Sequence, residues 1–260
     1  MKPTRPAAAA ARPTLVFLPG LASDEEVWAD VRAALAQAAS PALAPLLDAA
    51  RVADVHTRCA SLPEMAATLL SETTGPLVLL GHSMGGMVAQ LAARQAPARV
   101  AALALLGSSA RADTPELIRL RTEACEHFAA GRIDEVLRAN VPFAFHPDGA
   151  NDSALVARYF AMVRRGGADQ LIAQNRAVMA REDNRPHLAA IACPTLVLCG
   201  EDDGLTPPEV SREIAEAIPG ARMELVPRCG HMLTLEQPQA VAEALGAWLE
   251  HIAGGAAGLN

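Results

Sequence analysis

The chain has 260 residues, of which 51% are apolar, and its formal net charge is −7 at pH 7. This length fits one α/β domain with an inserted subdomain, and the apolar content is sufficient to bury a sizeable core. Because the acidic residues are spread out and no basic patch accompanies them, nucleic acids and anionic membrane surfaces are excluded as partners.

Five cysteines without a recurring spacing favour reduced thiols over a disulfide framework, so we expect a cytoplasmic protein. Residues 1–13 are expected to form a disordered leader. Prolines interrupt a short alanine run there, and the run is too weakly apolar for a secretory signal. No stretch of the sequence reaches membrane-spanning length.

From residue 14 onward, short apolar runs alternate with helix-period segments, the pattern of a parallel sheet wound with helices. Up to residue 111 the expected strands are 14–18, 51–56, 77–80 and 100–106, and the expected helices are 25–38, 62–71 and 84–95. The alternation resumes at 188–253 with strands at 195–199 and 222–226 and helices at 208–217 and 238–252. The two stretches together predict an α/β core with a doubly wound, mostly parallel sheet of about six strands.

Residues 112–187, between these stretches, contain no convincing strand. Helical periodicity covers 115–130, 133–140, 153–164 and 168–181, which predicts an inserted all-helical cap. An insertion of this kind usually lies over the carboxyl ends of the strands, where doubly wound sheets bind ligands. The glycine-rich tail, 254–260, is expected to be flexible.

The residues Gly81-His82-Ser83-Met84-Gly85 match G-x-S-x-G, with an apolar strand before the motif and a helix after it. Such a sharp turn exposes the serine Oγ at a helix N-terminus. There the backbone N–H of Met84 can bind an oxyanion and the helix dipole favours negative charge. Because five-residue patterns also match by chance, the motif indicates catalysis only if the sequence also offers catalytic partners for the serine.

A nucleophilic serine needs a base that is oriented by an acid, and in this architecture both follow the serine, each just after a strand. The strand at 195–199 is followed by a loop with three carboxylates, Glu201, Asp202 and Asp203. The strand at 222–226 is followed by Gly230-His231. Both candidates therefore fall at strand ends, in the required order.

With these motifs the chain resembles the α/β-hydrolase superfamily, in particular helical-cap serine hydrolases similar to carboxylesterases, from residue 14 to about 251. In that family a G-x-x-D-x-x-x-P segment carries the acid, and Gly200, Asp203 and Pro207 match it. The resemblance implies that Ser83 is the nucleophile, Asp203 the orienting acid and His231 the base. It leaves Glu201 and Asp202 as solvated loop residues.

The resemblance also implies a second oxyanion donor after the first strand. Relatives often read His-Gly there, whereas this chain reads Pro19-Gly20-Leu21, so a histidine that often orders the loop is missing. We expect the backbone N–H groups of Leu21 and Met84 to form the oxyanion hole. No cofactor is expected, and no metal either, because metal-binding motifs are lacking.

Five of the eight aromatic residues fall inside the cap. They could hold its helices together or roof an apolar pocket over the serine. The residues predicted to line the pocket are Phe143, Phe145, His146, Tyr159 and Met162, with Phe143 and Phe145 in a loop between two prolines. We expect His82 to have a packing role and His56 to be a surface residue.

These observations predict a hydrolase acting on ester bonds of small to medium, largely apolar carbonyl substrates through an acyl-enzyme. The same triad also suits a C–C hydrolase for meta-cleavage products, an enol-lactone hydrolase or an acyltransferase, although His82 stands where C–C hydrolases often carry Asn. A receptor with little turnover is a further alternative. Apolar cap surface could serve a homodimer or a substrate mouth, and the sequence leaves both open.

Overall fold

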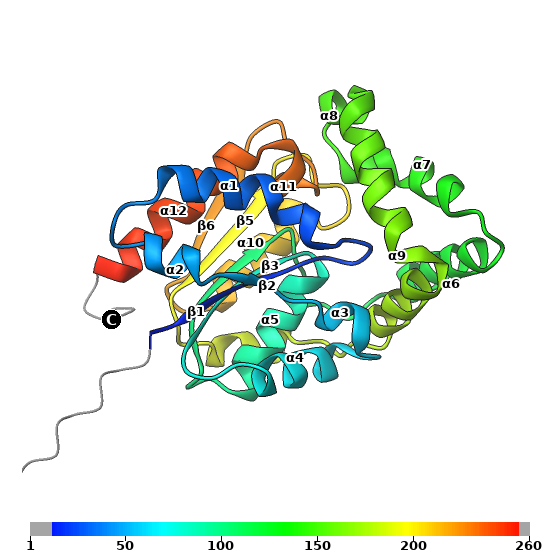
Figure 1. Cartoon of the computed structure of the whole chain (residues 1–260). Helices are drawn as coiled ribbons and strands as arrows, with labels where there is room; N and C mark the ends of the chain where they lie inside the picture. The colour runs from blue at the N-terminus through cyan, green and yellow to red at the C-terminus, as the bar shows by residue number, and fades with distance from the viewer. Residues whose placement is uncertain (1–11, 255–260) are drawn as a thin grey trace, which may run out of the picture.

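The computed structural model describes residues 12–254, arranged as a six-stranded sheet with helices on both faces (Figure 1). The predicted leader and tail lie almost entirely outside these residues. The strands are β1 (Thr14–Leu18), β2 (Arg51–Val52), β3 (Leu77–His82), β4 (Val100–Leu106), β5 (Thr195–Gly200) and β6 (Arg222–Val226). Their order across the sheet is β2-β1-β3-β4-β5-β6, and each neighbouring pair is parallel. The predicted fold class is confirmed.

Alternate residues of the central strands feed two apolar cores, one on each face. Leu15 and Phe17 of β1 belong to one cluster, and Val16 and Leu18 belong to the other. Strands buried on both faces require the continuous apolar runs that the sequence shows.

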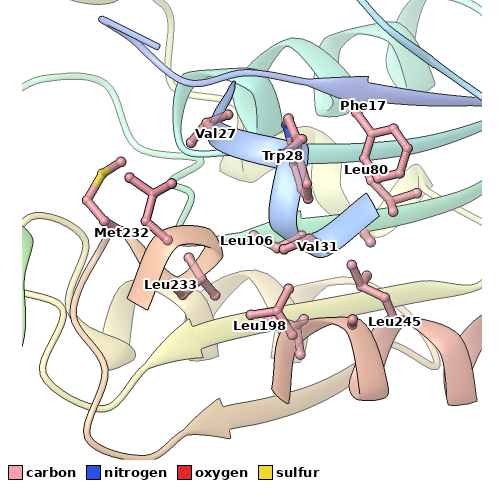
Figure 2. Packing of buried hydrophobic residues seen from close by; sticks show 14 of the residues in the cluster. Phe17, Val27, Trp28, Val31, Leu80, Leu106, Leu198, Met232, Leu233 and Leu245 are labelled. Carbon is pink, nitrogen blue, oxygen red and sulfur yellow. The ribbon is translucent and has the colours of Figure 1, made fainter. Parts of the chain in front are cut away.

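One face of the sheet is covered by the amino-terminal and carboxy-terminal helices. These are η1 (Glu25–Trp28), α1 (Ala29–Ala38), α2 (Ala44–Asp48), α11 (Leu233–Glu236) and α12 (Pro238–Gly254). The rings of Phe17 and Trp28 lie 5.0 Å apart in this core, and Leu233 belongs to the same cluster (Figure 2). Leu233 follows His231 by two positions, so the core anchors the segment after the predicted base.

The other face carries α3 (Val55–Arg58), α4 (Leu62–Ser71), α5 (Met84–Gln95), η2 (Arg185–Ala190) and α10 (Pro208–Ala217). Helix α4 is capped at its N-terminus: Ser61 Oγ accepts from the Glu64 N–H at 3.3 Å, and the Glu64 carboxylate accepts from the Ala60 N–H just before the cap. None of the helices in the described part of the chain combines the length and apolar character needed to cross a membrane.

Between β4 and η2 the cap comprises α6 (Pro115–Ala129), α7 (Ile133–Ala144), α8 (Pro147–Asn151) and α9 (Ser153–Met179). These helices lie together beyond the carboxyl ends of the strands (Figure 1). Helix α9 is interrupted at Gly167, whose φ of +73° and ψ of 171° are not helical. The two halves of α9 correspond to the two separate helices that the sequence predicts there.

One prediction about the cap is wrong. Phe143 lies in the last turn of α7 rather than in a loop, although Pro142 precedes it. The turn is held from outside the helix. The carbonyl of Phe143 accepts from the Gly204 N–H, and the carbonyl of Ala144 accepts from the Met232 N–H, both at 3.0 Å.

Candidate active site

Ser83 occupies a strained turn between β3 and α5. Its φ of 52° and ψ of −118° place a non-glycine residue in the left-handed half of backbone space, where strain typically costs about 1–3 kcal/mol. The glycines around it are required by close backbone approach. A Cβ on Gly85 would lie 2.1 Å from the carbonyl oxygen of Leu18, and one on Gly81 would lie 2.5 Å from Gly85. The motif therefore reflects the packing of α5 against β1 as well as the turn itself.

Two hydrogen bonds fix this turn to the neighbouring strand β4. The Ser83 N–H donates to the carbonyl of Leu106 at 2.8 Å, and the hydroxyl of Ser108 donates to the carbonyl of Ser83 at 2.9 Å. Sequence analysis missed Ser108, and the only signal for it was its position just after the β4 strand. The bonds leave Ser83 Oγ free to face the residues beyond β5 and β6.

The structure brings together the three side chains predicted to form a triad. His231 Nε2 lies 2.9 Å from Ser83 Oγ, and His231 Nδ1 lies 2.8 Å from Asp203 Oδ2. Asp203 and His231 are 3% and 5% exposed, whereas Ser83 is half-buried. An ionised carboxylate only accepts hydrogen bonds, so the Nδ1 proton points to Asp203 and Nε2 is left to accept the Ser83 proton.

The Asp203 carboxylate has four hydrogen-bond donors around it. Oδ1 accepts from the backbone N–H groups of Leu205 at 2.9 Å and Thr206 at 2.8 Å. Oδ2 accepts from the Thr206 hydroxyl at 2.8 Å as well as from His231. Burial alone would raise the pKa of Asp203, but the adjacent His231 and the bonds from Thr206 hold the pKa below its usual range. The carboxylate is therefore ionised and fixed in orientation.

Thr206 was missed in the sequence, although its spacing carried a signal. An Asp followed three residues later by Thr at the end of a strand is the pattern of a side chain that caps a local turn. The two carboxylates before it, Glu201 and Asp202, are exposed, as expected.

His82, the residue before the nucleophile, supports the base rather than the serine. It is 1% exposed, and its Nε2 donates to the carbonyl of His231 at 2.9 Å. Burial, reinforced by the neighbouring His231, lowers the pKa of His82 to about 3, so this ring is neutral near pH 7. The predicted packing role thus takes the specific form of a hydrogen bond to the His231 backbone.

Glu236 joins the base loop to the cap. Its carboxylate accepts from the Gly230 N–H at 2.9 Å and from the His146 N–H at 2.8 Å. Burial raises the pKa of Glu236 to about 7, although these two N–H groups act in the opposite direction. The signal in the sequence was the one carboxylate of the segment Leu233 to Gln237, five residues after the predicted base.

The predicted oxyanion loop lies directly against the nucleophile. A Cβ on Gly20 would be 3.1 Å from the Ser83 Cβ. Within residues 12–254, neither the Leu21 N–H nor the Met84 N–H donates to an acceptor of the protein. The oxyanion role predicted for these two N–H groups is thus left open by the hydrogen bonds of the protein.

The predicted pocket residues occupy four environments. Phe145 and Tyr159 are buried and pack edge to face, with ring centroids 5.3 Å apart. Met162 lines a cavity of about 110 Å³ between α9 and the loop after β1. The His146 ring caps α8 by accepting from the Asp148 N–H at 3.1 Å, while Phe143 is 56% exposed beside Gly204.

The surface position predicted for His56 is wrong. His56 is 5% exposed, and its Nε2 donates to the carbonyl of Ser23 at 2.9 Å. Its helix, α3, is only one turn long, so helical periodicity carried no information about which side is buried. Burial lowers the pKa of His56, which favours the neutral ring.

Comparison with known proteins places the chain among hydrolases. The model of the family described as "Alpha/beta hydrolase family" matches residues 15–244. The 2-hydroxy-6-oxononadienedioate/2-hydroxy-6-oxononatrienedioate hydrolase of Paraburkholderia xenovorans is 27% identical over 66% of this chain, and the match spans 62% of that relative. The pimeloyl-(acyl-carrier protein) methyl ester esterase of Nitrosomonas europaea is 29% identical over 87% of this chain and 92% of its own length. The structure of a thermophilic esterase from Thermogutta terrifontis, with malate bound, has a TM-score of 0.78 and 27% identity, covering 93% of this chain and 91% of that one.

Proposed function

This chain belongs to the alpha/beta hydrolase family, and on that premise we propose that it is a serine hydrolase that cleaves carboxylic esters of small to medium, largely apolar substrates. The observation that carries the proposal is the continuous relay from Ser83 Oγ through His231 to Asp203, with contacts of 2.9 Å and 2.8 Å. A structural serine requires neither a strained backbone nor a buried histidine and carboxylate aligned on its hydroxyl.

In the acylation step, Ser83 Oγ attacks the ester carbonyl while its proton passes to His231 Nε2. Asp203 stabilises the imidazolium that results, since its carboxylate faces Nδ1 at 2.8 Å. The negative charge on the former carbonyl oxygen is met by the N–H groups of Leu21 and Met84. Collapse of the tetrahedral intermediate breaks the bond to the alcohol, which takes the proton from His231 and leaves an acyl-serine.

Deacylation repeats the sequence with water as nucleophile. His231 Nε2 removes a proton from the water while its oxygen attacks the acyl carbonyl. The second tetrahedral intermediate then releases the carboxylic acid, and Ser83 Oγ regains its proton from His231. The protein's own side chains and backbone supply every group in this cycle.

The substrate class is supported by the apolar side chains of the cap and by the names of two similar proteins, both esterases. Leu205 in the acid loop and Phe143 next to Gly204 of that loop are exposed apolar residues, 41% and 56% accessible. In this proposal they offer contact surface for an acyl or alcohol group of the substrate. All five cysteines are free thiols, which supports a cytoplasmic location.

The proposal is tested by steady-state hydrolysis of 4-nitrophenyl esters from acetate to dodecanoate. Ser83→Ala should lower kcat by at least about a thousandfold with the fold unchanged, and Ser71→Ala, which alters an exposed serine on α4, should leave kcat unchanged. The chain length with the highest kcat/KM would give the size of the acyl site. A folded wild type that hydrolyses none of these esters would contradict the proposal.

A second candidate, hydrolysis of a C–C bond by the same triad, is supported by the similarity to the Paraburkholderia xenovorans hydrolase. It becomes the leading one if simple esters are not turned over but a 2-hydroxy-6-oxo-dienoate is cleaved in a Ser83-dependent way. Lactones and acyl transfer to an alcohol would be assayed with the same pair of proteins.

A further inference from the structure

Besides the half-exposed ion pair between Arg165 and Asp24, one buried side chain of the cap holds the loop after β1, that of Gln174. This residue lies in the second half of α9 and is 1% exposed. Its Oε1 accepts from the Ala22 N–H at 2.8 Å, and its Nε2 donates to the carbonyl of His56 at 3.0 Å. The buried side-chain amide of Gln174 thus has both its oxygen and its nitrogen hydrogen-bonded to backbone groups of the core. These groups lie 152 positions away, at Ala22, and 118 positions away, at His56.

Three hydrogen bonds link the loop, Gln174 and His56 in a closed network. His56 receives the amide proton of Gln174 on its carbonyl, and its own ring donates to the carbonyl of Ser23 at 2.9 Å. Because one end of the Gln174 side chain must accept from an N–H and the other must donate to a carbonyl, only one orientation of the amide fits. Consecutive residues of the loop, Ala22 and Ser23, are therefore fixed from two different helices, α9 and α3.

The loop needs this support because its own sequence does not favour its conformation. Ala22 has a φ of 62°, a left-handed backbone that a non-glycine residue adopts only under constraint from its surroundings. Pro19, at the start of the loop, has no N–H to donate and no polar side chain. Without a bond to the Ala22 N–H, the loop would relax toward ordinary backbone angles, and the adjacent Leu21 N–H would turn with it.

We propose that Gln174 is a positioning residue for the oxyanion hole, so that the Leu21 N–H is aimed at the reacting carbonyl only while α9 is docked on the core. This inference rests on the proposed function, since it assigns the aim of one donor of that site. A cap residue would then contribute to transition-state stabilisation without touching the substrate.

The test compares Gln174→Met, which keeps the length of the side chain but removes both hydrogen bonds, with Asn175→Leu. Asn175 is also buried on α9, but within residues 12–254 its side-chain hydrogen bonds go to Leu171 and Arg121 of the cap and not to the loop after β1. Both variants should melt at a lower temperature than the wild type. Only Gln174→Met should lose kcat, roughly ten- to a hundredfold, less than the 100- to 1,000-fold typical of deleting an oxyanion donor, with KM little changed.

Two further readouts separate positioning from general destabilisation. In the first readout a boronic acid is the inhibitor: Ser83 Oγ adds to the boron while the serine proton passes to His231, which gives a tetrahedral anion resembling the intermediate. Its inhibition constant should rise in Gln174→Met by a factor similar to the loss of kcat. Gln174→Glu keeps an oxygen that accepts from the Ala22 N–H, and its protonated form also donates to His56, so it should restore most of kcat.

The outcomes distinguish this inference from the proposed function. If wild type hydrolyses esters and Ser83→Ala does not, but folded Gln174→Met keeps wild-type kcat and boronate affinity, the inference is wrong and the function stands. If Ser83→Ala retains activity, the proposed function itself is wrong. If Gln174→Met does not fold, hydrogen exchange on the wild type decides: an Ala22 amide that exchanges as fast as in an unstructured peptide would overturn the inference.

Discussion

The hydroxyl of Thr206 allows a sharp test of how the acid of the candidate triad is held. It donates to Asp203 Oδ2 at 2.8 Å and lies 3.2 Å from His231 Nδ1, so it touches both groups whose alignment the mechanism requires. Thr206→Val replaces this hydroxyl with a methyl group of similar size. The backbone N–H of residue 206 still donates to Asp203 Oδ1, so the substitution removes one of four donors.

The expected magnitude follows from those contacts. A hydrogen bond to a charged group contributes about 1.5–3 kcal/mol, equivalent to roughly a 10- to 150-fold change in rate if all of it is lost from the transition state. Because three donors still hold the carboxylate, we expect the lower end, about a tenfold decrease in kcat. The pKa of Asp203, held below its usual range partly by this bond, should rise toward the ordinary value. The ionised Asp203 stabilises the fold above its unfolded pKa, and this stability is lost as the pH falls through the folded pKa. In Thr206→Val the loss should therefore occur at a higher pH than in the wild type.

The assay is ester hydrolysis as a function of pH, with melting temperatures at each pH for wild type, Thr206→Val and Thr206→Ser. The serine variant keeps the hydroxyl and should restore kcat to within about threefold of wild type if the bond matters rather than the methyl group. A Thr206→Val enzyme with wild-type kcat and an unshifted acid limb of stability would refute the reasoning. It would mean that Leu205 and Thr206 backbone donors suffice to fix Asp203.

Three further predictions concern the contacts of the cap. The pKa of Glu236 is raised to about 7, so the folded state favours its neutral form and its contribution to stability should fall as the pH rises from 4.5 to 7. Glu236→Gln should therefore make the melting temperature vary less with pH across this range. A slope equal to that of the wild type would contradict the assignment. In Gly230→Ala the new Cβ would lie 2.6 Å from the carbonyl carbon of Phe145, so the cap must shift; circular dichroism should show a lower melting temperature with secondary structure retained. Arg165 pairs with Asp24 at 2.7 Å but is half exposed, so Arg165→Met should cost about 1 kcal/mol or less in urea unfolding, and the difference should vanish at high salt.

The sequence was sufficient to predict the order of the sheet elements and of the candidate triad, because both depend on local patterns. The strand expected at 51–56 is an exception, since β2 is only Arg51–Val52 and the helix α3 begins at Val55. Apolar runs mark the strands, and Ser83, Asp203 and His231 each follow one of them, so parallel pairing brings them to one edge. The choice of Asp203 over Asp202 came from the family resemblance rather than from the residues alone. In the structure the difference is burial, since Asp202 is exposed and Asp203 is not.

What the sequence did not predict are contacts between distant segments. Gln174 is one polar residue on an amphipathic helix, and nothing in its neighbours indicates that it reaches Ala22. Phe143 was placed in a loop because Pro142 normally ends a helix, whereas bonds from Gly204 and Met232 extend it. His56 was missed for the same reason: its burial depends on the loop after β1 and not on its own one-turn helix.

The strand order also has a consequence for how the chain is made. Four neighbouring strands, β2-β1-β3-β4, come from the first 106 residues, so they can pair before the cap exists, whereas β5 and β6 add to one side afterwards. His231 lies 148 positions after Ser83, a delay of roughly 7 to 30 s at about 5–20 residues per second of synthesis. During that interval Ser83 lacks its candidate base, and until β5 is made the nascent chain also carries an unpaired β4 edge. The growing polypeptide therefore lacks the candidate relay, and its β4 edge is exposed to edge-to-edge pairing while the cap is being translated.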